Sequence, residues 1–223
     1  VTEILSWSDT EIHLTVPEDA ATGVITVTVN DVTSNEADFI VEASLASIIP
    51  SKGGAGDTVI MNGQGFGASQ SEASGTVTYN LVAAGIASWS SDRIKSLVPR
   101  GVPPGQANIA VTVYGIKSNE IPFTIQPKID SIVPNAAAVG DEIEIYGTNF
   151  TDDSKWVSFN GKQTTEFSEW TDTLITLEVP EKAETGPVKL IANGIESETV
   201  EFTVKPGITS IDKDSLAVGD ELT

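Results

Sequence analysis

The chain repeats a short tryptophan motif three times. The motif begins at Trp7, returns at Trp89 and again at Trp170, each time with an isoleucine at the fifth following position. The step is about 80 residues, which is the length of a small domain and too long for one unit of a solenoid. The sequence therefore predicts a string of similar domains, and any function must be sought at that level.

Other markers keep the same step and set the domain boundaries. Ser47-Ile-Ile-Pro50 recurs as Ser131-Ile-Val-Pro134, and Gly56-Asp57 recurs as Gly140-Asp141 and Gly219-Asp220. We predict two complete domains, residues 44–127 and 128–206. Residues 1–43 match only the second half of such a domain, and residues 207–223 match only its beginning. We therefore expect an excerpt from a longer array that starts and stops inside domains.

Each complete domain has the pattern of a β-sandwich. Runs of β-branched residues, such as 24–29, 109–113 and 188–192, mostly alternate in character, which is typical of half-buried strands. Asn193-Gly194 suits a two-residue hairpin turn. About seven short strands in about 80 residues indicate an immunoglobulin-like sandwich. We predict an all-β fold of tandem sandwiches arranged as beads on a semi-rigid rod, because the connections at Pro127 and Pro206 are short.

Aromatic residues that recur at matching positions, or that alternate with other inward-facing residues, are assigned to the structural core. This set is Trp7, Trp89, Trp170, Phe66, Phe150 and Phe159. A repeated aromatic residue most often packs between sheets, so no ligand is assigned to the recurring tryptophans.

The second complete domain carries a series of short motifs in a fixed order: Ile132-Val-Pro134, Gly140-Asp141, Gly147-Thr-Asn-Phe150, Val157-Ser-Phe-Asn-Gly161, Trp170, Val179-Pro180, Gly186 and Asn193-Gly194. The first complete domain departs from this series at Tyr79-Asn-Leu81. In this order along the chain, the motifs resemble those of the IPT/TIG family of immunoglobulin-like domains. The resemblance implies the fold and no particular chemistry. It implies one of several settings: spacers in bacterial surface proteins, accessory domains of glycan-acting enzymes, stalks of surface glycan-binding proteins, or DNA-contacting or dimerising domains of eukaryotic transcription factors.

Charge and composition exclude several classes of function. The net charge of −20 argues against binding to nucleic acid or to anionic membranes. The chain has no cysteine, so it can form neither a disulfide nor a thiolate site. The lone His13 has no nucleophile or metal-ligand set around it. We therefore predict that the protein is not an enzyme and has no nucleic-acid partner and no membrane-inserted segment.

Two aromatic residues of the second domain are candidates for contact with a polysaccharide or a partner protein. Trp156 alternates with Val157 and Phe159, which turns it outward, and it has no counterpart in the first domain. Tyr146 is outward-facing beside Trp156 in strand register, and we expect the two to share one surface. An exposed aromatic ring can stack on a sugar or on a neighbouring protein. The alternative is that Trp156 packs under a loop or a domain junction.

A calcium ion is the cofactor that the acidic residues suggest, although none is required. Asp152 and Asp153 lie in the loop after Phe150, and Asp130 or Asp212 would complete an oxygen-only site at a domain junction. The spacing of these aspartates matches no defined calcium-binding loop. The alternative, that the protein has no cofactor, therefore stays open.

The leading interpretation is a non-catalytic spacer or stalk in a large secreted or cell-surface protein, of the adhesin type. Its partners would be neighbouring immunoglobulin-like domains of the same chain, and also a polysaccharide or a host or cell-surface protein. Three alternatives stay open: a glycan-binding module, an accessory region of a polysaccharide-acting protein, and a filament subunit assembled by strand complementation.

Overall fold

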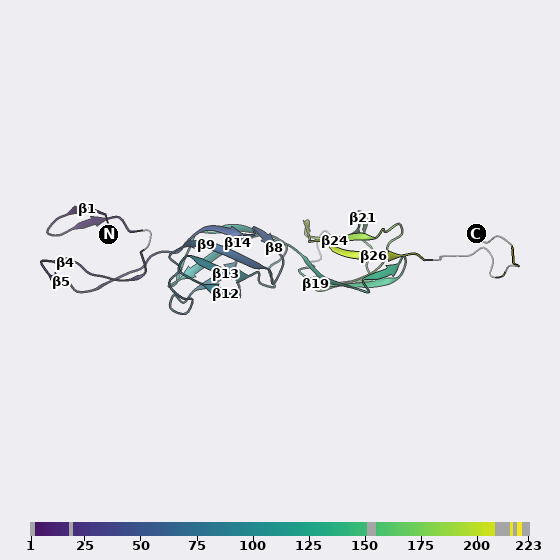
Figure 1. The fold of residues 1–223 in the computed structure, drawn as a ribbon, viewed down its shortest axis with the longest axis horizontal. Coiled ribbons are helices and arrows are strands. Elements are labelled where there is room, and N and C mark those ends of the chain that lie inside the picture. Colours follow the sequence, from purple (N-terminus) through teal and green to yellow (C-terminus); the bar gives the residue numbers. More distant parts are fainter. Residues whose placement is uncertain (1–2, 18–19, 151–154, 208–214, 216–217, 220–223) are drawn as a thin grey trace. The chain divides into compact units, whose positions relative to one another are not determined.

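The computed structural model describes residues 3–17, 20–150, 155–207, 215 and 218–219, and every regular element in these ranges is a β-strand. The chain divides into two compact units, residues 1–102 with 106–125, and residues 103–105 with 126–223. Each unit contains one complete two-layer sandwich (Figure 1). The all-β class predicted from the sequence is confirmed.

The first complete sandwich packs a four-stranded sheet on a six-stranded one. The four-stranded sheet has the order β12 (Ile86–Trp89), β13 (Arg93–Leu97), β9 (Thr58–Gln64) and β7 (Ser44–Ile49). The other sheet has the order β11 (Val82–Ala83), β10 (Thr76–Tyr79), β14 (Gly105–Val113), β16 (Ile121–Ile125) and β8 (Lys52–Gly53), and β15 (Ile116–Lys117) pairs with β14.

The second complete sandwich repeats this plan strand for strand. Its four-stranded sheet has the order β17 (Lys128–Val133), β19 (Glu142–Thr148), β23 (Leu174–Glu178) and β22 (Glu169–Trp170). Its six-stranded sheet has the order β18 (Ala136–Ala138), β26 (Val200–Lys205), β24 (Gly186–Ala192), β20 (Trp156–Phe159) and β21 (Lys162–Thr164), and β25 (Ile195–Glu196) pairs with β24. Each sandwich also has a cis X–Pro bond at the matching position, before Pro50 and before Pro134.

Alternation along the strands places the apolar side chains between the two layers. In β19, Ile143 and Ile145 are buried while Glu142 is exposed, and in β9 Val59 and Met61 take the matching buried positions. Because successive strand residues point to opposite faces, this pattern gives each sheet one apolar face. Each sandwich therefore has a core of its own.

Residues 3–42 form paired strands but no closed sandwich. They contain three two-stranded sheets: β1 (Ile4–Trp7) with β2 (Ile12–Leu14), β3 (Gly23–Ile25) with β6 (Ala37–Phe39), and β4 (Thr28–Val29) with β5 (Val32–Thr33). Ile25 and Val29 are 54% and 50% exposed, whereas Ile109 and Val113, at the corresponding positions of the first complete sandwich, are 0% and 1% exposed. Within the described residues, nothing forms the second layer that would cover this face.

A glycine, a phenylalanine and a tryptophan form one packing unit in each complete sandwich. Phe66 and Phe150 are buried, and their backbone carbonyls accept hydrogen bonds from the indole N–H groups of Trp89 at 2.9 Å and of Trp170 at 2.7 Å. A Cβ added to Gly63 would lie 2.1 Å from the Ser44 oxygen and 2.5 Å from the Phe66 ring. Only glycine therefore fits beneath the phenylalanine.

The recurring tryptophans are placed differently in the complete and partial domains. Trp89 and Trp170 are partly buried against the two cores, whereas Trp7 is 51% exposed. The Trp89 ring fills the space beside Gly75, where an added Cβ would come within 2.3 Å of it, and the Lys155 ammonium lies 5.4 Å from the centre of the Trp170 ring. The rings of Trp89 and Trp170 are therefore committed to contacts within their own sandwiches.

The first core contains a polar pair that the second lacks. Tyr79 on β10 is fully buried, and its hydroxyl lies 3.1 Å from the Ser96 hydroxyl on β13 of the opposite sheet. Burial raises the pKa of Tyr79 to about 12, and the hydrogen bond from Ser96 opposes part of that shift. At the position of Tyr79 the second sandwich has Phe159, which is also buried.

Replacing Gly63 by alanine is expected to destabilise the first domain by about 3 kcal/mol, because the new methyl group meets backbone and a buried ring. Gly85→Ala is the matched control, because its Cβ would meet only the Leu97 side chain at 3.9 Å. Chemical denaturation of residues 43–125 measures both free energies of unfolding. Equal effects of the two substitutions would contradict the packing account.

The buried phenol predicts a loss of stability in alkali. Unfolded Tyr79 releases its proton near the ordinary tyrosine pKa of 10.0, whereas folded Tyr79, with its raised pKa, keeps the proton to about 12. The folded state therefore binds more protons between these values, and the free energy of unfolding falls by at most about 1.4 kcal/mol per pH unit. Denaturation of residues 43–125 at pH 9 to 11 should show this slope, and Tyr79→Phe should reduce it. An unchanged slope in the variant would show that Tyr79 is not the source.

Candidate functional site

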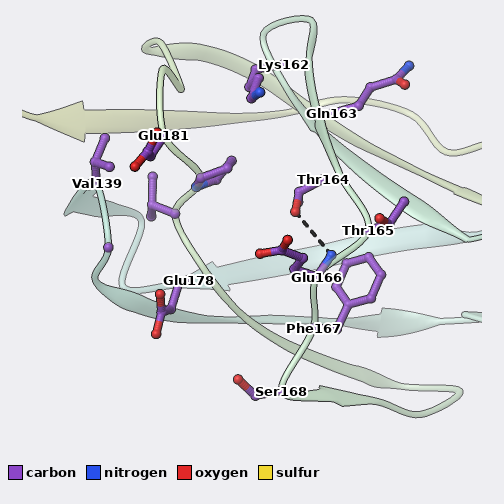
Figure 2. A pocket seen from close by; sticks show the side chains of 13 residues that line it. Val139, Lys162, Gln163, Thr164, Thr165, Glu166, Phe167, Ser168, Glu178 and Glu181 are labelled. Atoms are coloured by element: carbon purple, nitrogen blue, oxygen red, sulfur yellow. Dashed lines mark hydrogen bonds between the residues drawn. The ribbon is translucent and has the colours of Figure 1, made fainter.

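A hollow lies at one edge of the second sandwich, lined by residues of both sheets. Its volume is about 870 Å³. We call it the edge groove and define it by its lining residues: Val139, Gly140, Lys162–Ser168 and Glu178–Glu181. Figure 2 shows Lys162 and Gln163 on one side of the opening, with Glu178 and Glu181 across from them. The edge groove thus joins the end of β23 to the edge strand β21.

An added residue accounts for the opening. The segment from Lys162 to Trp170 is one residue longer than its counterpart from Val82 to Trp89. In the first sandwich β12 pairs with β13 as far as Ile86, and the Leu97 N–H then donates to the Gly85 carbonyl at 2.8 Å.

In the second sandwich the corresponding pairing stops early. Strand pairing of β22 with β23 covers only Glu169 with Thr176 and Trp170 with Ile175, and the Ser168 N–H donates to the Thr176 carbonyl at 2.8 Å. Before Ser168 the backbone turns away, with the Glu166 N–H donating to the Thr164 hydroxyl at 3.2 Å (Figure 2). The end of β23 is left uncovered as a result.

The lining of the edge groove is mostly polar, and three of its four charged side chains are acidic. Glu166, Glu178 and Glu181 are exposed, and Lys162 is the cation among the lining residues. Phe167 contributes an apolar wall whose ring packs edge-on against Trp170, with 4.6 Å between ring centres. A ligand could therefore contact the acidic side chains and the Phe167 ring, which Trp170 holds in place. The lining residues include no nucleophile paired with a base.

The two aromatic residues predicted to contact a ligand lie on different sheets, so the expectation that they share one surface is wrong. Trp156 is half-buried on β20 of the six-stranded sheet, opposite Ile191. Tyr146 is 40% exposed on β19 of the four-stranded sheet, and its hydroxyl donates to the Glu144 carboxylate at 2.5 Å. That hydrogen bond raises the pKa of Tyr146 above its usual value. A role in ligand contact stays a prediction for both residues.

Of the predicted calcium ligands, only Asp130 can be placed. It is exposed on β17, whereas Asp152, Asp153 and Asp212 lie outside the described residues. Within the described ranges, no three His, Cys, Asp or Glu side chains are grouped to hold a metal ion. Two of the three aspartates that follow a recurring glycine can be placed, and both accept a backbone hydrogen bond: Asp57 from the Gly54 N–H and Asp141 from the Ala138 N–H, both at 2.8 Å.

His13, to which the sequence assigned no catalytic or metal-binding role, lies at the surface. Its Nε2 is 3.0 Å from the Glu11 carboxylate, and both side chains are exposed. The edge groove itself was not predicted from the sequence. Two features of the sequence could have indicated it. The segment from Lys162 to Trp170 is longer than its counterpart in the first domain, and glutamates stand where the first domain has Gly85, Leu97 and Arg100.

A family model describes both complete sandwiches. The IPT/TIG domain model matches residues 43–125 and again residues 127–204, which together make up most of the chain. The chain belongs to the IPT/TIG family. Its two complete IPT/TIG domains are the sandwiches described above, and none of the curated proteins matches the sequence.

Solved structures that resemble the chain do so weakly. The extracellular region of plexin A4 is 14% identical with a TM-score of 0.36, and the alignment covers 73% of this chain and 18% of plexin. A surface glycan-binding protein from Prevotella bryantii is 15% identical with a TM-score of 0.36, covering 73% of this chain and 42% of that one. A gamma-CGTase from Alkalophilic bacillus clarkii is 17% identical with a TM-score of 0.35, covering 74% and 26%.

The chain thus spans less than half of each of these three structures. Similarity at this level does not indicate a ligand or an activity, so the family assignment rests on the two matched domains. The described part of the chain also contains no helix long and apolar enough to cross a membrane.

Proposed function

We propose that the two IPT/TIG domains act as a non-catalytic spacer in a secreted or cell-surface protein. The observation that carries this proposal is the connection between them. Strand β16 ends at Ile125 and β17 begins at Lys128, so only Gln126 and Pro127 intervene. A spacer must hold its neighbours at a defined distance, and a connector of two residues leaves few backbone torsions free.

Both connector residues have restricted conformations. Gln126 is buried, and its side-chain amide donates to the Glu196 carbonyl of the second sandwich at 2.8 Å. The proline ring fixes φ at Pro127, and it also restricts the backbone of the residue before it. The net charge of −20 supports the same role, because a highly charged surface opposes aggregation.

The spacer proposal predicts a narrow distribution of distances between the two domains. Since the chain has no cysteine, Ser88→Cys and Thr203→Cys place one spin label on an exposed site of each sandwich. Electron–electron dipolar spectroscopy should give a narrow distribution in this protein. Inserting about six Gly and Ser residues between Gln126 and Pro127 should broaden it, because such linkers behave as flexible coils. A parent distribution as broad as that of the insertion variant would overturn the proposal.

A second candidate function is glycan binding, and the geometry of Tyr146 favours it. The ring is exposed on the four-stranded sheet and its hydroxyl is held by Glu144. A ring fixed in this way loses little conformational entropy when it stacks on a sugar.

Glycan binding predicts that the chain is retarded in affinity electrophoresis on gels that contain soluble polysaccharides. Tyr146→Ala should abolish the retardation, and Trp156→Ala tests the other predicted contact. Tyr114→Ala, on the first domain, is the control. Absence of retardation on every polysaccharide, with the folded parent protein, would leave the spacer as the better account.

Strand complementation between copies stays a prediction. The exposed inner face of residues 3–42 provides the apolar surface that such assembly requires, since Ile25 and Val29 correspond to core positions of the complete domain. The segment predicted to pair with it, residues 207–223, lies largely outside the described residues.

A further inference from the structure

We propose that the edge groove of the second sandwich binds an extended, positively charged segment of a partner protein as an added β-strand. The groove is flanked by two strand edges, one from each sheet, whose backbone groups face it. Unpaired strand edges are templates for a further strand, and peptide recognition by β-strand addition uses such edges.

The first open edge is the end of β23. The Val179 N–H donates to the Asp141 carbonyl and the Val179 carbonyl accepts from the Gly140 N–H, both at 2.9 Å. The backbone of Val179 therefore points toward the start of β19. Because neighbouring residues in a strand direct their N–H and C=O groups to opposite sides, the backbone of Glu178 points away from β19 and into the edge groove.

In the first sandwich the corresponding strand edge is paired. Leu97 takes the place of Glu178 there, and its N–H donates to the Gly85 carbonyl at 2.8 Å. In the second sandwich β22 does not reach so far, and Glu178 has no backbone partner on this side among the described residues. The Glu178 backbone is thus free to form a strand hydrogen bond that the corresponding residue of the first sandwich, Leu97, makes within its own domain.

The second open edge is β21, the last strand of the six-stranded sheet. The Asn160-Gly161 turn is closed by the pair Phe159 and Lys162, so the next pair, Ser158 and Gln163, is a pair without mutual hydrogen bonds. The backbone of Gln163 therefore faces outward, beside the edge groove that its residue lines. In the first sandwich the Ala84 N–H bonds inward to Val77, as this alternation requires.

The charge of the lining selects the occupant. Three glutamates, Glu166, Glu178 and Glu181, surround the groove against one lysine, Lys162, which favours lysine or arginine side chains on an incoming strand. Phe167 offers an apolar contact for a residue that points inward. An oligosaccharide would need the face of an exposed ring, whereas Phe167 is half-buried and packed on Trp170.

The test uses the whole chain and a fluorescein-labelled octapeptide of alternating lysine and threonine as the probe. Fluorescence anisotropy should show saturable binding that weakens with added salt, because the contact is electrostatic and exposed. An octapeptide of alternating glutamate and threonine should bind at least about tenfold more weakly. Equal binding of the two peptides, or no binding of the basic one, would overturn the proposal.

Paired variants separate strand addition from general charge attraction. Gln163→Pro removes the outward N–H of β21 and should weaken binding about tenfold, whereas Ala83→Pro, at the matching edge position of the first domain, should have no effect. The double variant Glu178→Lys, Glu181→Lys should weaken binding about tenfold, and Glu201→Lys, on the exposed side of β26, much less. Binding unchanged by Gln163→Pro would overturn strand addition.

A measurement on the unmodified protein makes the outcome independent of variant folding. Backbone amide NMR spectra recorded with and without the lysine–threonine peptide should shift at residues 162–168 and 177–181. Shifts confined to other surfaces would overturn the assignment of the site. The same shifts with cello-oligosaccharides and not with the peptide would show that the groove binds sugar, which also overturns it.

Discussion

The hydrogen bond from a tryptophan indole to a phenylalanine carbonyl is the contact on which each complete sandwich depends. Trp89 donates to Phe66 in one domain and Trp170 to Phe150 in the other. A buried indole N–H without an acceptor would cost free energy, so the loop after the long central strand has one favoured position. Gly63 and Gly147 belong to the same unit, because a side chain there would displace the phenylalanine.

This commitment of the aromatic residues to packing determines which surfaces remain for recognition. Rings that fill the space beside Gly75 or lie beneath Lys155 are not available to a ligand. On the two complete sandwiches, the surfaces that remain include the exposed Tyr146 ring, the half-buried Trp156 ring, the outer faces of the sheets and the strand edges. The two domains also differ at an edge, where a loop longer by one residue leaves the end of β23 without a backbone partner among the described residues.

The cores of the two domains also differ in a way that has physical consequences. A buried tyrosine and serine join the two sheets in the first domain, whereas the phenylalanine of the second needs no partner. The first domain thus contains a buried titratable group that the second lacks at the matching position, although the two share their topology.

Much of the fold could be predicted from the sequence, because its signals are local. Alternation at Ile143 and Ile145, the Asn193-Gly194 turn and the recurring tryptophan follow from the geometry of single strands and turns. The class of fold and the repeat were determined at that level. Strand alternation does not show which sheet carries a residue. Tyr146 and Trp156 both point outward by alternation, but they lie on different sheets. The edge groove was decided only by tertiary structure, because it depends on two segments that meet across both sheets, and no pattern within either segment shows that a hydrogen bond between strands will be missing.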